Sequence, residues 1–208
     1  MAEQKTPRFG RDDVEILRRE TPFSGFFRLD RLELRHRLFG GGWSKPLIRE
    51  LFVRTEAVAV LPFDPRREEV LLVEQFRVGA LDFRDNPWCL ELIAGIADKP
   101  DEPLEELARR EAMEEAGIQL DRLIPLPSYL ASPGGSNERL TLFLAPADLS
   151  DAGGIHGHPE EGEDIRVHTF PVASLQELMD KGRLDNAPAL IAVHWLLLNY
   201  GKLGQEER

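Results

Sequence analysis

The chain has 208 residues, of which 42% are hydrophobic and 30% are charged, and its formal net charge is −11. This length and composition are typical of a globular protein and exclude a disordered one. The acidic balance argues against a nucleic-acid backbone as the main partner, because such proteins usually carry a basic patch. A small phosphorylated substrate is compatible with it, since a metal ion can lie between carboxylates and phosphate.

The single cysteine, Cys89, lies in an apolar stretch and is interpreted as a buried structural thiol. One cysteine excludes an internal disulfide, and the polar first thirteen residues lack the apolar core of a signal peptide. The most apolar late segment, 189–198, is too short to span a membrane. We therefore expect a cytoplasmic protein without a membrane or nucleic-acid partner.

In chain order, the first predicted elements are strands. Hydrophobic and charged residues alternate over 32–38 and again over 47–53, on either side of a turn at 40–42. This pattern predicts a small antiparallel sheet, which is marginal alone and must pack on something. We expect residues 1–54 to form an N-terminal β-sheet and dimerisation region, and residues 55–208 to form the main domain.

The main domain alternates strands and helices. Apolar runs predict strands at 57–61, 70–73, 88–94, near 124–131, 140–144 and 165–170, with helices at 104–116, 175–181 and 187–199. A long loop rich in glycine, histidine and acidic residues covers 150–164. This mixed order predicts an α+β fold, as an α/β/α sandwich.

The segment 104–116 is predicted as one helix because it contains no glycine or proline. Pro103 suits a first turn, Asp101 or Glu102 would supply the N-terminal cap, and Gly117 would end the helix.

Glu111 and Glu115 are four residues apart, so their carboxylates share one helix face, with Glu114 beside them. Like charges at this spacing destabilise a helix by a few tenths of a kcal/mol. Two interpretations stand on this spacing alone. The helix is either a solvated acidic surface paired with Arg109 and Arg110, or part of a site for a hard cation such as Mg²⁺.

A longer pattern surrounds these glutamates. Gly95, Glu102, Arg110-Glu111, Glu114-Glu115 and Gly117 resemble the Nudix box, G-x5-E-x7-R-E-U-x-E-E-x-G-U, in which U is apolar. Every fixed position from Glu102 onward is present, but six residues instead of five follow Gly95, and the insertion falls within 97–101. The placement of Gly95 against the helix is therefore left open. The resemblance implies the Nudix fold and the hydrolysis of a nucleoside diphosphate linked to another moiety.

Other segments resemble the ADP-ribose pyrophosphatases of the Nudix family. They are Ser132-Pro133-Gly134-Gly135, with Pro133 15 residues after Ile118, and the segments 25–27, 35–39, 61–65, 154–157 and 163–168. The resemblance implies hydrolysis of ADP-ribose to AMP and ribose 5-phosphate. Two alternatives are a pyrophosphatase for another nucleotide-sugar, such as GDP-mannose, and a non-catalytic nucleotide-binding sensor. Sensors of that kind typically lack the box glutamates, which are present here.

The resemblance also implies roles for individual residues. Glu161 would be the general base on a mobile loop, with Glu160 as the alternative, although both also fit an ordinary solvated acidic loop. His156 and His158 are interpreted as loop residues, because Mg²⁺ sites prefer oxygen. The cofactor would be Mg²⁺, or alternatively Mn²⁺, held by Glu111, Glu115, Glu163 and the backbone carbonyl of Ala94.

The same resemblance implies a homodimer in which the N-terminal sheets are exchanged, so that Phe26 and Phe27 contact the adenine bound to the partner subunit. The alternative for either phenylalanine is core packing, and the alternative for any single arginine is a surface charge. Arginine suits phosphate because its guanidinium donates two hydrogen bonds at once. The implied substrate-binding residues are Phe26, Phe27, Arg49, Glu50, Arg54, Arg77, Ile96, Ser132, Pro133, Gly134 and Glu138.

Overall fold

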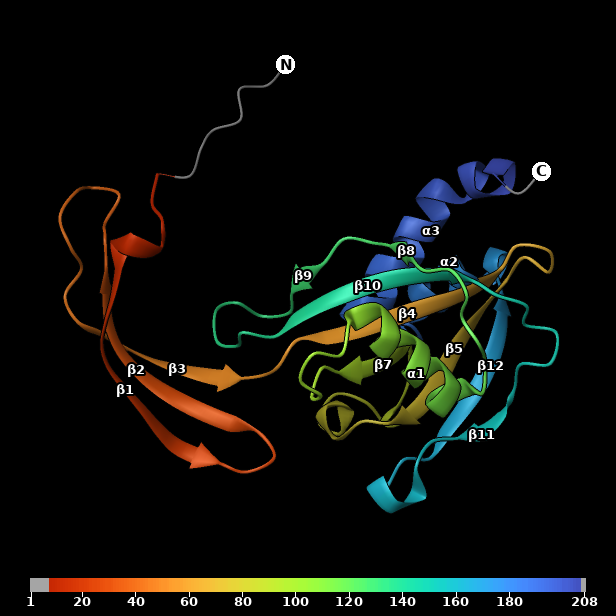
Figure 1. Cartoon of the computed structure of the whole chain (residues 1–208), viewed down its shortest axis with the longest axis horizontal. Helices are drawn as coiled ribbons and strands as arrows, with labels where there is room; N and C mark the ends of the chain where they lie inside the picture. The colour runs from red at the N-terminus through yellow and green to blue at the C-terminus, as the bar shows by residue number, and fades with distance from the viewer. Residues whose placement is uncertain (1–7, 207–208) are drawn as a thin grey trace. The chain divides into compact units, whose positions relative to one another are not determined.

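The structure, a computed structural model, describes residues 8–206, and the side chains of Glu161 and of residues 203–206 lie outside this description. The chain divides into two compact units (Figure 1). Unit 1 holds the described residues up to Arg54 together with Leu130–Glu138. Unit 2 holds Thr55–Tyr129 and the described residues from Arg139 onward.

Unit 1 contains a three-stranded antiparallel sheet in the order β1-β2-β3. After the short 3-10 helix η1 (Arg11–Asp13), its strands are β1 (Val14–Ser24), β2 (Arg28–His36) and β3 (Leu47–Val53). The two alternating runs of the sequence correspond to β2 and β3, whereas β1 was not predicted as a separate strand. Leu32 is the one buried hydrophobic residue among the described residues of this unit, so the sheet has almost no core of its own.

A mixed β-sheet forms the centre of unit 2, in the order β11-β12-β5-β4-β10-β8, with β6 paired to β5 and β7 paired to β4. Strand β10 runs parallel to β4, whereas β5 and β7 run antiparallel to it. The strands are β4 (Ala57–Asp64), β5 (Glu69–Phe76), β6 (Trp88–Glu91), β7 (Ile93–Ile96), β8 (Ile124–Pro125), β9 (Tyr129–Leu130), β10 (Arg139–Pro146), β11 (Gly154–His156) and β12 (Ile165–Pro171).

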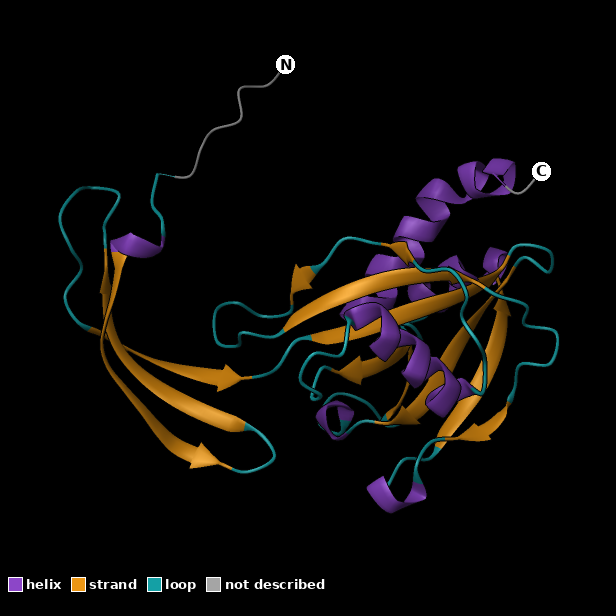
Figure 2. Cartoon of the chain, in the orientation of Figure 1, coloured by secondary structure: helices purple, strands orange, loops and turns teal. Residues whose placement is uncertain are grey.

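Helices cover both faces of this sheet (Figures 1 and 2). Helix α1 (Leu104–Ala116) packs through Leu107 on Val58 and Val73, whereas α2 (Leu175–Asp180) and α3 (Ala187–Glu206) pack on the face that contains Leu61. All eight residues of β4 are buried because the strand lies between these layers. Full burial of a leucine or valine side chain contributes about 1.5–3 kcal/mol. The predicted α/β/α sandwich is confirmed, and it fixes α1 firmly against the sheet.

Helix α1 has the predicted bounds, but its first turn differs from the prediction. Pro103 is the N-cap and no side chain caps the helix, so the cap expected from Asp101 or Glu102 was wrong. Glu102 binds Arg110 instead. At the other end, Gly117 adopts a left-handed conformation with φ 65°, as expected of a residue that ends a helix.

Several short elements also differ from the sequence prediction. The run 88–94 is divided into β6 and β7, and the strand expected near 124–131 is two short strands, β8 and β9. The loop 150–164 contains β11 and the 3-10 helix η3 (Pro159–Glu161), and α3 extends past residue 199 to Glu206. Within residues 8–206, no helix combines the length and the apolar character needed to cross a membrane.

Candidate functional site

The two glutamates of the predicted metal site lie where α1 meets β7. Glu115 is only 4% exposed, and its Oε2 accepts a hydrogen bond of 3.0 Å from the backbone nitrogen of Ala94. Next to Ala94, a Cβ atom added to Gly95 would lie 2.4 Å from the side chain of Glu111. Gly95 therefore faces the helix despite the extra residue before Glu102, which the loop between β7 and α1 accommodates.

Arg110 holds the carboxylates around it in place. Its Nε lies 3.1 Å from Glu102, and its Nη1 lies 3.0 Å from Glu111 and 2.8 Å from Glu114. The hydrogen bond with Glu102, together with the other two carboxylates, raises the pKa of Arg110 despite its partial burial. The box arginine is thus a permanent cation that orients three of the box glutamates.

Burial shifts the pKa of both inward-facing glutamates upward. Burial raises the pKa of Glu115 to about 8, against the opposing effect of the Ala94 hydrogen bond, and the charges of Glu111 and Glu163 add to the rise. Burial likewise raises the pKa of Glu111 to about 7, although Arg110 lowers it. A buried carboxylate next to a half-buried one is poised to bind a cation, because the cation offsets both the burial and the charge repulsion that raise the pKa.

Glu163 belongs to the loop between β11 and β12. The loop is fastened to α1 by a 3.3 Å hydrogen bond from the Gly157 nitrogen to the Glu114 carbonyl. It is closed by two hydrogen bonds, from the Glu163 nitrogen to the His158 carbonyl at 3.1 Å and from the His158 nitrogen to Glu163 Oε2 at 3.3 Å. The backbone of Glu161 lies in η3 within this loop, but the predicted role of its side chain falls outside the described part of the structure.

The donor set is compatible with a hard cation that keeps open positions. Within the described residues, no group of three or more His, Cys, Asp or Glu side chains is arranged to hold a metal ion. Two carboxylates beside β7, one buried and one half-buried, do suit Mg²⁺, which usually takes one or two protein carboxylates and fills its shell with water and substrate phosphate. The residues therefore fit a divalent-cation site that substrate completes better than a closed structural site.

Two predicted substrate-binding residues share unit 2 with these glutamates. Arg77 follows β5 and forms an ion pair with Glu91, with 2.8 Å between Nε and Oε2. Ile96 is the last residue of β7, directly after Gly95. Arg77 lowers the pKa of Glu115 slightly, which places its charge within electrostatic reach of the carboxylate pair.

The other predicted substrate-binding residues belong to unit 1. Arg54 forms an ion pair of 2.9 Å with Glu138, and its guanidinium lies 4.4 Å from the ring centroid of Phe27. Phe27 also packs edge-on against Phe52 at 5.0 Å, so it fulfils the core-packing alternative in part. Phe26 is 87% exposed and is therefore available for contact with a base.

The loop with Pro133 lies beside β3 in the same unit. The Phe52 nitrogen donates to the Gly135 carbonyl at 2.8 Å, and the Arg54 nitrogen donates to Asn137 Oδ1 at 2.7 Å. The remaining predicted residues of this unit, Arg49, Glu50, Ser132, Pro133 and Gly134, are exposed. Unit 1 thus gathers the Arg54 cation, aromatic rings and exposed polar groups.

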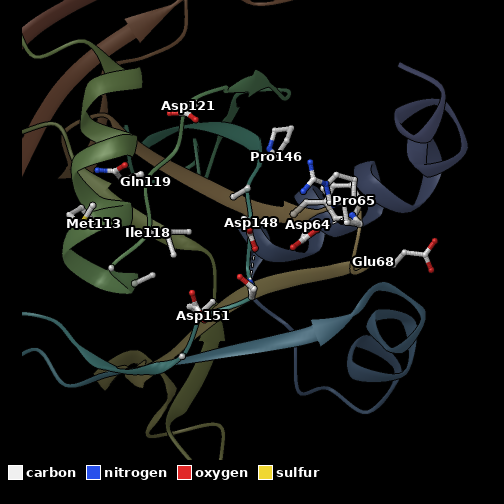
Figure 3. A pocket seen from close by; sticks show the side chains of 18 of the residues that line it. Asp64, Pro65, Glu68, Met113, Ile118, Gln119, Asp121, Pro146, Asp148 and Asp151 are labelled. Carbon is white, nitrogen blue, oxygen red and sulfur yellow. Dashed lines mark hydrogen bonds between the residues drawn. The ribbon is translucent and has the colours of Figure 1, made fainter. Parts of the chain in front are cut away.

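A hollow of about 1640 Å³ in unit 2 contains none of the predicted site residues (Figure 3). It lies beyond the end of α1, between Gln119 and Asp121 on one side and Pro65 and Glu68 on the other (Figure 3). The buried carboxylate on its wall, Asp64, accepts hydrogen bonds from three backbone nitrogens, those of Arg66, Arg67 and Leu149. Asp64 therefore has a structural role, and the box glutamates are the better candidate site.

Three residues around the site were not assigned a role from the sequence. Arg110 was noted only as part of the box, although its position four residues before Glu114 would have predicted their ion pair. Glu91 is a charge inside the apolar run 88–94, a signal for a partnered residue. Asn137 gave no signal, because its hydrogen bond to Arg54 joins residues that are far apart in sequence.

Comparison with known proteins identifies the family of the chain. The model of the NUDIX domain matches residues 53–192, and the chain belongs to the NUDIX family. The chain is 46% identical to the ADP-ribose pyrophosphatase of Escherichia coli strain K12, over 95% of this chain and 94% of that protein. It is 44% identical to the ADP-ribose pyrophosphatase of Haemophilus influenzae, over 95% and 92% of the two chains.

More distant relatives match as well. The GDP-mannose pyrophosphatase of Escherichia coli strain UTI89 is 28% identical over 73% of this chain and 78% of that protein. The crystal structure of an ADP compounds hydrolase superposes with a TM-score of 0.69 at 22% identity, and covers 88% of this chain and 94% of that one. This structural likeness establishes the shared fold.

Proposed function

We propose that the protein is a metal-dependent hydrolase that cleaves the pyrophosphate bond of ADP-ribose, giving AMP and ribose 5-phosphate. The observation that carries this proposal is the pair formed by the buried Glu115 and the half-buried Glu111, set against β7 on the box helix. The pair occurs in a chain that is 44–46% identical to ADP-ribose pyrophosphatases over nearly its whole length.

In the proposed chemistry the metal ligands come from α1, from β7 and from the loop between β11 and β12, and the same loop supplies the general base. Glu161, or alternatively Glu160, takes the proton of the attacking water. Its place on a loop allows closure around substrate to complete the site. A bound divalent ion, Mg²⁺ or alternatively Mn²⁺, neutralises pyrophosphate charge and lowers the pKa of water. The proposed ligands are Glu111, Glu115, Glu163 and the carbonyl of Ala94.

The proposed nucleotide contacts come mostly from unit 1. Phe26 would stack on the adenine, and Arg54 and Arg49 would neutralise phosphate charge, as Arg77 of unit 2 would. Because Arg54 already pairs with Glu138, substrate would compete with that ion pair or extend it. Glu50, Phe27, Ile96, Ser132, Pro133 and Gly134 complete the proposed set.

The test is a substrate panel with the purified full chain. It measures kcat/KM for ADP-ribose, GDP-mannose and other nucleoside diphosphate sugars in Mg²⁺, and identifies the products. The proposal expects ADP-ribose to be the best substrate, with AMP and ribose 5-phosphate formed in equal amounts. GDP-mannose is the specific competitor because a GDP-mannose pyrophosphatase is among the relatives. A clear preference for the guanine sugar would replace the proposed substrate.

The proposal includes a cytoplasmic homodimer formed through unit 1. Among the described residues, the sheet of unit 1 buries one hydrophobic residue, Leu32, and leaves large apolar side chains exposed to water, which a second subunit would cover. These include Ile16, Leu17, Phe23, Ile48 and Phe52. The buried, unpaired Cys89 is compatible with a reducing compartment. Light scattering should give twice the mass of the chain, whereas a monomer at micromolar concentration would contradict this part of the proposal.

A further inference from the structure

Arg77 is held by one carboxylate through one edge of its guanidinium. Its Nε lies 2.8 Å from Oε2 of Glu91, and its backbone nitrogen donates to the Pro87 carbonyl at 3.0 Å. Among the described residues, none accepts a hydrogen bond from Nη1 or Nη2 of Arg77. The contact with Glu91 therefore fixes the direction of the guanidinium and leaves its two terminal nitrogens available for a bidentate contact with phosphate.

Strand register places this ion pair on the side of the sheet that carries the box glutamates. Glu91 on β6 is paired with Val73 on β5, and paired residues of antiparallel strands project to the same side of a sheet. Val73 belongs to the core beneath α1, where it lies with Leu107. Glu91 and the guanidinium bound to it therefore face the α1 side, and the charge of Arg77 is felt at Glu115.

Glu91 is itself held in a defined electrostatic setting. Its side chain is 18% exposed, whereas that of Arg77 is 47% exposed, so the carboxylate is the anchored partner and the arginine the outward one. Arg84, which forms an ion pair with Asp185, adds a second cation near Glu91. The surrounding charges thus hold the Glu91 carboxylate in place before substrate binds. Substrate binding therefore loses no conformational entropy in ordering this side chain.

We propose that Glu91 is a positioning residue, which aims the Arg77 guanidinium at the diphosphate of the substrate through the 2.8 Å ion pair on the α1 side of the sheet. The inference rests on the proposed function, since it requires a diphosphate ligand at this face. Glu91 does not touch the substrate, and all of its effect on binding passes through Arg77.

The test is a double-mutant cycle with Glu91→Ala, Arg77→Ala and the double variant, measured as KM and kcat with ADP-ribose and Mg²⁺. Glu91→Ala should raise KM roughly tenfold and change kcat by less than about twofold, because the lost contact binds ground state and transition state alike. In the Arg77→Ala background, Glu91→Ala should have no further effect on KM. Equal effects of Glu91→Ala in both backgrounds would overturn the proposal.

The chain offers a matched control on the same strand. Arg67 and Glu69, at the other end of β5, form an ion pair of the same 2.8 Å length with side chains 48% and 20% exposed. Glu69→Ala should leave KM unchanged, although it removes an ion pair of similar kind. Glu91→Gln provides a second route if Glu91→Ala folds poorly, because its amide oxygen keeps an acceptor for Arg77 Nε. Its KM should lie between those of the wild type and Glu91→Ala.

Failure of the positioning role and failure of the proposed function give different results. Calorimetric titration with ADP-ribose measures the same cycle as dissociation constants, without turnover. A wild type that binds ADP-ribose but does not cleave it disproves the proposed function, and the cycle in binding still decides the role of Glu91. A wild type that cleaves ADP-ribose while its cycle is additive disproves only the positioning role. A wild type that neither binds nor cleaves it contradicts both.

Discussion

The backbone nitrogen of Ala94 donates a hydrogen bond of 3.0 Å to the carboxylate of Glu115, and so ties β7 to the last turn of α1. Side chains of β7 and of α1 pack in the same hydrophobic core, so the donor and the acceptor of this hydrogen bond are both held in place. It brings the backbone of Ala94, whose carbonyl is a proposed metal ligand, next to the most buried carboxylate of the site. The predictions below follow from this relationship.

The first prediction concerns the charge of Glu115. Glu115→Gln should lower kcat by roughly 10²–10⁴-fold, because the amide is a poor ligand for a hard cation. The metal-free variant should nevertheless melt at a higher temperature than the wild type above about pH 8, since it no longer buries a charge. Scanning calorimetry in chelator and steady-state kinetics measure the two effects. A variant with near wild-type turnover would remove Glu115 from the mechanism.

The second prediction concerns stability against pH in the metal-free protein. The pKa of Glu115 rises from the ordinary 4.5 to about 8 on folding, and that of Glu111 rises to about 7. A raised folded pKa means that the folded state binds the proton more tightly. The resulting stabilisation is complete below the unfolded pKa of 4.5 and is lost as the pH rises through about 7 and about 8.

The melting temperature in chelator should therefore fall between about pH 5.5 and about pH 8.5. The carboxyls with lowered pKa, such as Glu102, act at lower pH and leave this window unaffected. Added Mg²⁺ should raise the melting temperature most at the alkaline end, because the ion binds the deprotonated pair. Glu115→Gln should reduce the slope, and an equal slope in the variant would place its cause elsewhere.

The third prediction concerns Gly95. In Gly95→Ala the new Cβ would lie 2.4 Å from Cγ, Cδ and Oε1 of Glu111, so that side chain must move. Because displacement of a ligand by about 1 Å can cost about 10²-fold in rate, kcat/KM should fall by at least about tenfold. Gly201→Ala in α3 is the control, since nothing lies within 4 Å of its added Cβ. Equal activity of the two variants would show that Glu111 does not require its present position.

The fourth prediction separates the two candidate bases. Glu161→Gln should lower kcat by roughly 10²–10⁴-fold with little change in the melting temperature, because the residue belongs to the loop between β11 and β12 and its proposed role is to act on the proton of water. Glu160→Gln should change kcat by less than about twofold. The reverse result would assign the base to Glu160, and full activity in both variants would exclude a carboxylate base from η3.

The sequence predicted the elements that have a clear period or a clear end. Helix α1 was correct in both bounds because it lacks internal glycine and proline and is followed by Gly117. Strand β1 was missed because Val14–Ser24 contains adjacent charges, a proline and irregular register with β2, which hide its alternation. Strands of two or three residues, such as β8 and β11, are too short to show any period.

For the candidate site, too, the sequence predicted only what the spacing along a single element determines. The spacing of Glu111 and Glu115 predicted a shared face, but only the packing of α1 on β7 shows that Glu115 is buried and bonded to Ala94. The ion pair between Arg77 and Glu91 joins residues that are 14 apart through the β5–β6 pairing. Pairings of this kind depend on strand register, which a single sequence does not specify.

The most direct measurement of the central claim is the turnover of ADP-ribose by the full chain, first in chelator and then as Mg²⁺ is added back. Wild type should form no AMP in chelator, and should form AMP and ribose 5-phosphate in equal amounts as the ion returns. Glu111→Gln and Glu115→Gln should stay nearly inactive or need far more Mg²⁺. Undiminished turnover in chelator, or the same Mg²⁺ dependence in all three proteins, would contradict a cation-dependent pyrophosphatase centred on these two glutamates.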